Sequence, residues 1–210
     1  MKWEEYIEND FNKDSVIPFE YEGNITEIKE KAEKGDLESQ FVLAMLYLFG
    51  SEVERDLKKA VKWFTKFSKA SEEKIKSVLD VLGFFYKNGL GTEKDLNKAI
   101  ELYEMSVEKG SVDALVRLAE IYKEIGEIEK SLEFYRAGAA KGSAEAQCFL
   151  ASFYINGTGV EKDYNKAIEW CRKSVEQGNI QAHGMLGYLY EYGKGTEIDL
   201  KKAIKLYEIA

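Results

Sequence analysis

Few residues of this sequence have the types and spacing that catalysis or metal binding requires. There is one histidine, His183, and there are two cysteines, Cys148 and Cys171. One histidine cannot supply an H-E-x-x-H site or a two-cysteine, two-histidine metal site. A cysteine–histidine nucleophile would need one thiol to reach His183 from another structural repeat. We therefore predict no catalytic residue, no metal and no cofactor, and we interpret these three residues as packing residues.

The segment 193–196, GKGT, has the glycines and lysine of a phosphate-binding loop without its spacing. No G-x4-G-K-[ST] run is present, and no predicted β-strand precedes the segment. Related turns recur at 89–92 and 157–160 without the lysine. We therefore interpret the segment as a structural turn. The 38 carboxylates follow predicted solvent-facing helix positions, which favours solubility over acid–base catalysis.

Composition indicates a globular protein that binds neither nucleic acid nor membrane. The 210 residues are 45% hydrophobic, contain a single proline and carry a formal net charge of −8. A negative average field repels polyanions and favours basic partners. No stretch reaches the roughly 20 apolar residues of a membrane span, and the first residues lack the apolar core of a signal peptide. We expect a cytoplasmic protein.

A fivefold repeat organises the chain. A tyrosine recurs at intervals of 32 to 39 residues, with a leucine one helical turn before it and a small residue directly after that leucine. A small residue at a fixed helical position predicts close approach of a second helix. The tyrosines are Tyr47, Tyr86, Tyr122, Tyr154 and Tyr190.

A glycine turn and a second helix follow the tyrosine in four of the five repeats. One or two glycines come three to five residues after it, and an alanine comes thirteen residues after it: Ala60, Ala99, Ala167 and Ala203. Glycine supplies left-handed backbone conformations at helix ends. Repeat three has a shorter turn, with Ser131 nine residues after Tyr122. Asn24 or Thr26 is expected to cap a preceding helix.

The predicted fold is all-α: a right-handed α-solenoid of about five helix-turn-helix repeats with an N-terminal half-repeat cap. The repeats span about 35–71, 72–110, 111–142, 143–178 and 179–210. Residues 24–34 form the capping helix, and residues 1–23 form a tail that packs on the first repeat.

The pattern resembles the Sel-1-like repeat, a relative of the tetratricopeptide repeat. The match is fullest over 146–170, at Ala146, Leu150, Tyr154, Gly157, Gly159, Val160, Asp163, Ala167 and Trp170. The resemblance implies a helical adaptor that assembles protein complexes. One secreted branch of the family, associated with β-lactam binding, has disulfides in each repeat. This chain lacks those cysteines, so that function does not carry over.

The binding surface is predicted from the first helix of each repeat, which lines the concave face of two-helix solenoids. Positions away from the leucine–tyrosine packing face are polar or aromatic in repeats two to five. They suit a basic peptide or protein, with aromatic side chains as anchors. The predicted residues are Asp80, Phe84, Lys87, Asn88, Glu120, Lys123, Glu124, Ser152, Asn156, Tyr188, Glu191 and Tyr192.

Repeat one places apolar residues at the same positions: Phe41, Met45, Leu48 and Phe49. An open apolar patch of this size is unusual in a monomer. Either a partner covers it or the tail 1–23 does, and we expect the tail.

These features predict a non-enzymatic protein–protein interaction module, an adaptor or scaffold. One alternative is an immunity-type inhibitor of a basic toxin, suggested by small size and acidity. A second is a hydrolase of cell-envelope substrates, and a third is a structural spacer. Homodimerisation through the last helix, with Leu206, Ile209 and Ala210 on its stacking side, is a further hypothesis.

Overall fold

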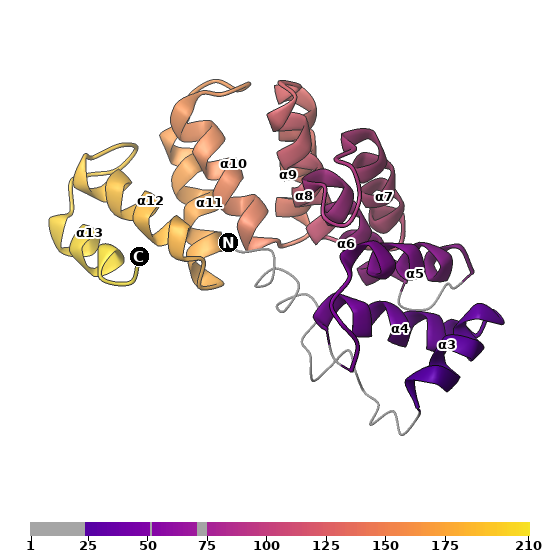
Figure 1. The fold of residues 1–210 in the computed structure, drawn as a ribbon. Helices are drawn as coiled ribbons and strands as arrows, with labels where there is room; N and C mark the ends of the chain where they lie inside the picture. Colours follow the sequence, from indigo (N-terminus) through magenta and orange to yellow (C-terminus); the bar gives the residue numbers. More distant parts are fainter. Residues whose placement is uncertain (1–23, 51, 71–74) are drawn as a thin grey trace. The chain divides into compact units, whose positions relative to one another are not determined.

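The computed structural model describes residues 24–50, 52–70 and 75–210, and within them the chain forms α-helices joined by turns (Figure 1). These residues contain eleven helices and no β-strand. None of these helices is both long and apolar enough to cross a membrane. The helices are α3 (Ile25–Glu33), α4 (Leu37–Phe49), α5 (Leu57–Ala70), α6 (Ile75–Asn88), α7 (Leu96–Glu108), α8 (Asp113–Glu124), α9 (Ile128–Ala140), α10 (Ala144–Asn156), α11 (Tyr164–Glu176), α12 (Ile180–Glu191) and α13 (Leu200–Tyr207).

The chain divides into two compact units, Met1–Ser111 and Val112–Ala210. In unit 1, α3 packs on α4, α4 pairs with α5, and α6 pairs with α7. In unit 2, the pairs are α8 with α9, α10 with α11, and α12 with α13 (Figure 1). Each pair consists of the first and second helix of one sequence repeat, which confirms the all-α repeat fold. The tail prediction for residues 1–23 lies outside the described residues.

Short polar side chains begin most of the helices by capping backbone N–H groups. Asp36 accepts a hydrogen bond from the N–H of Ser39 at 2.8 Å, and Ser143 accepts one from Ala146 at 3.2 Å. Asn24 accepts from the N–H of Thr26 at 3.0 Å, which makes Asn24 the N-cap of α3. The capping residues therefore set where each helix starts.

The second glycine of the long turn lets the turn contact the preceding repeat. Gly91 has a φ of +67°, and a Cβ there would lie 2.5 Å from the backbone carbonyl of Leu57 at the start of α5. A side chain at this position would both strain the backbone and clash. A Cβ on Gly195 would likewise lie 2.7 Å from Cβ of Tyr164. The recurring glycine is thus a packing requirement between consecutive repeats.

The small residue beside the leucine allows the close helix approach that the spacing predicts. A Cβ on Gly83 in α6 would lie 2.9 Å from the ring of Tyr103 in α7. In repeat three, Ser131 stands where the second helix of the other repeats has alanine, and its hydroxyl donates to the carbonyl of Ala119 at 2.7 Å. The turn of this repeat is short, since α8 ends at Glu124 and α9 begins at Ile128.

Candidate functional site

The first helices of unit 2 carry most of the predicted binding residues on one surface, which we call the first-helix surface of unit 2. It consists of described side chains on α8, α10 and α12, and it is built around one ion-pair cluster and one tyrosine cluster. Its residues are Arg117, Glu120, Lys123, Glu124, Glu145, Ser152, Asn156, Tyr188, Glu191 and Tyr192.

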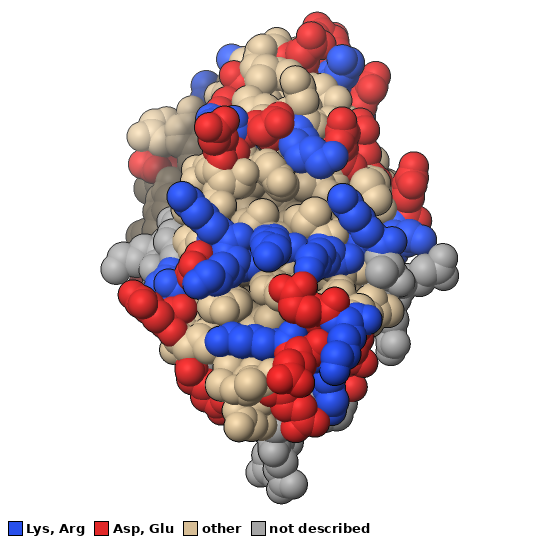
Figure 2. Space-filling view, turned by 45° about the vertical axis from the view of Figure 1, so that its right-hand side comes forward, with Lys and Arg blue, Asp and Glu red and all other residues tan. Residues whose placement is uncertain are grey.

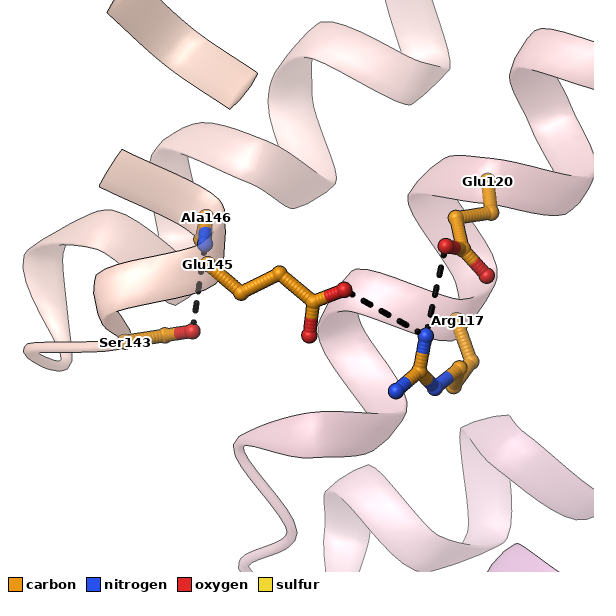
Figure 3. Close-up of polar contacts among 5 residues, drawn as sticks. All are labelled: Arg117, Glu120, Ser143, Glu145 and Ala146. Atoms are coloured by element: carbon orange, nitrogen blue, oxygen red, sulfur yellow. Dashed lines mark hydrogen bonds and ion pairs between the residues drawn. The ribbon is translucent and has the colours of Figure 1, made fainter. Parts of the chain in front are cut away.

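Arg117 joins α8 to α10 (Figure 3). Its Nη1 lies 3.2 Å from Oε1 of Glu120, one helical turn away, and 3.5 Å from Oε1 of Glu145 on α10. The Arg117 side chain is only 18% exposed, so solvent screens these pairs less than a fully exposed ion pair. One guanidinium therefore bridges two carboxylates, one from its own helix and one from α10.

The capping bond of α10 positions one of the two carboxylates. Ser143 accepts from the N–H of Ala146 and fixes the first helical turn, from which Glu145 extends to Arg117 (Figure 3). An acidic residue in the first turn is also favoured by the helix dipole. The capping serine at the start of α10 therefore helps to place the Glu145 carboxylate beside Arg117.

Tyr135 of α9 lies under the cluster. Its ring packs against Phe149 and Phe153 of α10, at centroid distances of 4.9 and 5.6 Å. Burial raises the pKa of the Tyr135 phenol, and the carboxylates of Glu120 and Glu145 raise it further. The phenol therefore stays neutral, and the charge of the surface resides in the glutamates.

The second cluster consists of tyrosines on α12 and α13. The rings of Tyr188 and Tyr192 lie 5.0 Å apart and tilt by 42°, and both are exposed. Tyr207 of α13 donates its hydroxyl to Oε2 of Glu191 at 2.8 Å. Partial burial and this hydrogen bond raise the pKa of Tyr207 to about 12. Exposed aromatic faces beside a carboxylate are suited to a cationic side chain.

The remaining predicted residues of unit 2 make local contacts. Nζ of Lys123 lies 5.7 Å from the centroid of the Phe149 ring. Asn156 donates from Nδ2 to Oγ of Ser152 at 3.2 Å, one turn away on α10. Glu124 is exposed near the end of α8. These side chains add polar groups to α8 and α10.

In unit 1 the predicted binding residues are less accessible. Asp80 is buried and accepts a hydrogen bond from Oγ of Ser111 at 2.9 Å. Phe84 is half-buried against the core of the unit, Lys87 is half-buried, and Asn88 donates to the carbonyl of Phe84 at 2.8 Å. Asp80 therefore holds α6 to the end of the unit rather than facing a partner.

The apolar residues of repeat one belong to the core. Phe41, Met45 and Leu48 are buried, and Phe49 packs partly buried against them. The ring of Phe41 lies 6.1 Å from that of Phe64 and 5.3 Å from that of Phe67, both on α5. The second helix of the same repeat therefore contributes ring contacts to Phe41. The tail that was predicted to cover these residues lies outside the described part of the chain.

The cysteines and the histidine are structural. Cys148 and Cys171 are buried and unpaired, and burial raises their pKa to about 11 and about 12. His183 is buried at the start of α12, where its Nδ1 lies 2.8 Å from the carbonyl oxygen of Asn179. Thiols with such raised pKa values hold almost no nucleophilic thiolate at neutral pH.

Arg117 and Tyr207 are site residues that the sequence projection missed. Arg117 stands five residues before Tyr122, at a position that is Val42, Val81, Phe149 and Met185 in the other repeats. A charged residue at a position that is apolar in the other four repeats was the sequence feature that could have marked Arg117 as a site residue. Tyr207 was not among the predicted binding residues, and only the three-dimensional structure shows its hydroxyl reaching Glu191.

Fold and surface together define a helical-repeat protein with a polar, aromatic first-helix face. Four segments match the family model described as Sel1 repeat: 37–71, 81–111, 144–179 and 180–210. The chain belongs to the Sel1 repeat family, whose members generally mediate protein–protein interactions. The short-turn third repeat falls outside the matched segments, in agreement with its divergent spacing.

Two of the proteins similar to this chain are much longer than it, and a third is less than 25% identical and shows a shared fold. A protective antigen of uropathogenic Escherichia coli strains is 31% identical with a TM-score of 0.77, over 89% of this chain and 40% of that one. A Sel1 repeat protein from Oxalobacter formigenes is 24% identical with a TM-score of 0.71, over 89% and 83%. Activator of C kinase protein 1 of Saccharomyces cerevisiae is 34% identical over 87 residues, which are 39% of this chain and 14% of that protein.

A more distant neighbour is an immunity protein from Pseudomonas aeruginosa. It is 22% identical with a TM-score of 0.54, over 88% of this chain and 71% of that one. At this identity the likeness concerns the fold alone.

Proposed function

We propose that this chain is a non-enzymatic adaptor that binds a basic segment of a partner protein on the first-helix surface of unit 2. The observation that carries the proposal is a pair of exposed tyrosine rings on a surface that also carries glutamates. Glu120 and Glu145 share one arginine, and Tyr188 and Tyr192 lie exposed beside Glu191. Tyrosine anchors flanked by carboxylates are suited to arginine and lysine side chains.

Affinity capture with matched variants tests this proposal. The tagged chain is incubated with extract from its host, and the recovered proteins are quantified by mass spectrometry. Tyr188→Ala/Tyr192→Ala should reduce recovery of the specific partner at least about tenfold, because truncated aromatic anchors typically cost over 1 kcal/mol each. Glu120→Gln/Glu145→Gln should weaken it in low salt more than in high salt.

The control is a variant altered on a different surface, Lys109→Glu/Lys141→Glu, which should leave recovery unchanged. Equal recovery of every protein by the wild type and the tyrosine variant would place the interface elsewhere. A recovered partner whose binding segment is acidic would contradict the charge argument.

An immunity-type inhibitor is a second candidate, supported by the fold shared with immunity proteins and by the net charge of −8. In this case the basic partner is a toxin. Co-expression with the product of the neighbouring gene tests it: protection from a toxic neighbour supports inhibition, and protection should be lost in Tyr188→Ala/Tyr192→Ala. A harmless neighbour that this chain does not bind would leave the adaptor as the only candidate.

A further inference from the structure

Helix α5 in unit 1 carries a stripe of lysines. Lys58, Lys62, Lys66 and Lys69 follow one another at steps of four, four and three residues, which places them on one side of the helix. The helix contains a fifth lysine, Lys59, and no acidic residue. Figure 2 shows a band of lysine and arginine side chains on the face of the molecule that it draws. In a chain of net charge −8, this concentration of positive charge needs an explanation.

The repeat itself provides the comparison. Counted from the buried alanine of each second helix, three of the four lysine positions of α5 carry no lysine in α7 or α11, and the third in order is a lysine only in α11. In α7 they are Asn97, Glu101, Met105 and Glu108. In α11 they are Asn165, Glu169, Lys173 and Glu176. Two positions that carry glutamate in both relatives carry lysine in α5, so the fold does not require the stripe.

The stripe is also costly for the helix. Like charges one turn apart destabilise a helix, and the stripe contains three such steps. Within the described residues, Lys66 pairs with Glu33 of α3 at 3.0 Å, and its Nζ lies 4.2 Å from the ring centroid of Trp63. Nζ of Lys62 lies 5.5 Å from the same ring. The indole therefore holds two ammonium groups in place without neutralising them.

We propose that the lysine stripe of α5 binds an extended acidic segment of a partner protein, with aspartate or glutamate at alternate positions. Lysines four residues apart on a helix are separated by about 6 Å along its axis. Alternate side chains of an extended peptide lie about 6.7 Å apart and point the same way. One edge of such a segment can therefore place a carboxylate beside each successive ammonium group.

The width of the stripe favours a single extended chain over a duplex or a bilayer. The four lysines span about 16 Å along one helix. Carboxylates lie beside the lysines of α5: Glu33 pairs with Lys66, and Asp56 pairs with Lys59, each at 3.0 Å. A DNA duplex or an anionic membrane is wider than one helix and would meet these carboxylates as well as the lysines. A narrow peptide can follow the lysines along α5 and meets fewer of the surrounding carboxylates.

Fluorescence anisotropy tests the proposal with a labelled peptide of alternating glutamate and serine, and with a glutamine–serine peptide as its neutral counterpart. The full chain should bind the acidic peptide at low salt concentration and release it as the salt concentration rises. It should not bind the neutral peptide. Lys62→Glu/Lys69→Glu, which copies the α11 pattern, should bind at least about tenfold more weakly. Because it removes like-charge neighbours, this variant should melt at the same or a higher temperature than the wild type.

The matched control is Lys109→Glu/Lys141→Glu, which changes the net charge equally at exposed positions outside α5. It should retain binding of the acidic peptide to within about twofold. Equal loss in both variants would show that only net charge matters and would overturn the proposal. Tighter binding of duplex DNA or of phosphatidylserine vesicles than of the peptide would overturn the choice of partner.

This site is independent of the proposed function, because it lies in unit 1 and takes a partner of opposite charge. Tyr188→Ala/Tyr192→Ala should leave the acidic peptide bound. The two proposals can therefore fail separately.

Discussion

The thiols of Cys148 and Cys171 lie in the helix-packing core of unit 2, where neither is charged at neutral pH. Ser174, near them on α11, is also buried and donates its hydroxyl to the carbonyl of Ala144 at 2.7 Å. The same pattern holds for Ser131 and Ser111, whose hydroxyls bond to Ala119 and Asp80. These small polar side chains serve packing between helices, since each satisfies a buried partner rather than facing solvent.

Thiol chemistry gives the first prediction. At pH 8 a free cysteine, with a pKa near 8.5, is partly thiolate, whereas a thiol of pKa about 11 is at least about a hundredfold less ionised. We expect Cys148 and Cys171 to react with Ellman's reagent far more slowly in the native chain than in guanidinium chloride. Single Cys148→Ser and Cys171→Ser variants assign each signal. Rapid native labelling of either cysteine would contradict the packed structure.

Two glycines of α12 give the second prediction, because they differ only in what lies beside them. A Cβ on Gly187 would lie 2.8 Å from the ring of Tyr207, whereas one on Gly184 would meet only Cβ of Ala210, at 3.7 Å. Gly187→Ala should destabilise the fold by about 1–3 kcal/mol through overpacking. Gly184→Ala should stabilise it by about 0.5–1 kcal/mol through helix propensity. Urea unfolding of both variants checks this, and equal effects would exclude the contact with Tyr207.

At the scale of helices, the sequence predicts the elements well and the exposed faces less well. The leucine, small residue and tyrosine recur in all five repeats and the alanine in four, and this spacing locates the helix pairs. The projected binding face was less accurate, because Asp80 is buried, and so are Phe41, Met45 and Leu48. A helical projection gives relative angles, but which angle is covered depends on neighbouring helices, and those contacts are set only in the folded chain.

The aspartate caps of the second helices give the third prediction. Hydrogen bonds from backbone N–H groups hold the pKa of Asp56, Asp163 and Asp199 below the usual range. A pKa lower in the folded than in the unfolded state means that the caps stabilise the fold above about pH 4 and lose this contribution as pH falls through the folded pKa. Asparagine caps equally well without titrating, as Asn179 does in α12.

The variant Asp56→Asn/Asp163→Asn/Asp199→Asn should therefore melt like the wild type at pH 7 and lose less thermal stability between pH 5 and pH 2. Circular dichroism melts at several pH values measure this. The corresponding alanine variant, which removes the caps, should melt lower already at pH 7. Identical acid profiles for wild type and the asparagine variant would assign the acid sensitivity to other carboxylates.

For the molecule as a whole, the repeats concentrate apolar exposure in one region. Of the ten exposed large hydrophobic side chains among the described residues, eight lie between Ile180 and Ile209. Stacked helical repeats bury the apolar face of each repeat against the next. An exposed apolar surface on α12 and α13 therefore favours association, either with a partner or with a second copy.

Self-association is the last prediction. The exposed side chains of Leu200, Ile204 and Ile209 belong to α13 or directly follow it, and burying them against a second copy removes apolar area from water. We expect the chain to form a dimer at high micromolar concentration, measured by light scattering after size-exclusion chromatography. Ile204→Glu should yield a monomer, because it would place a charge in the apolar contact. Lys109→Glu, at an exposed position in unit 1, should leave the dimer intact. A monomeric mass for the wild type at every concentration would contradict self-association and would favour a different protein as the partner of this surface.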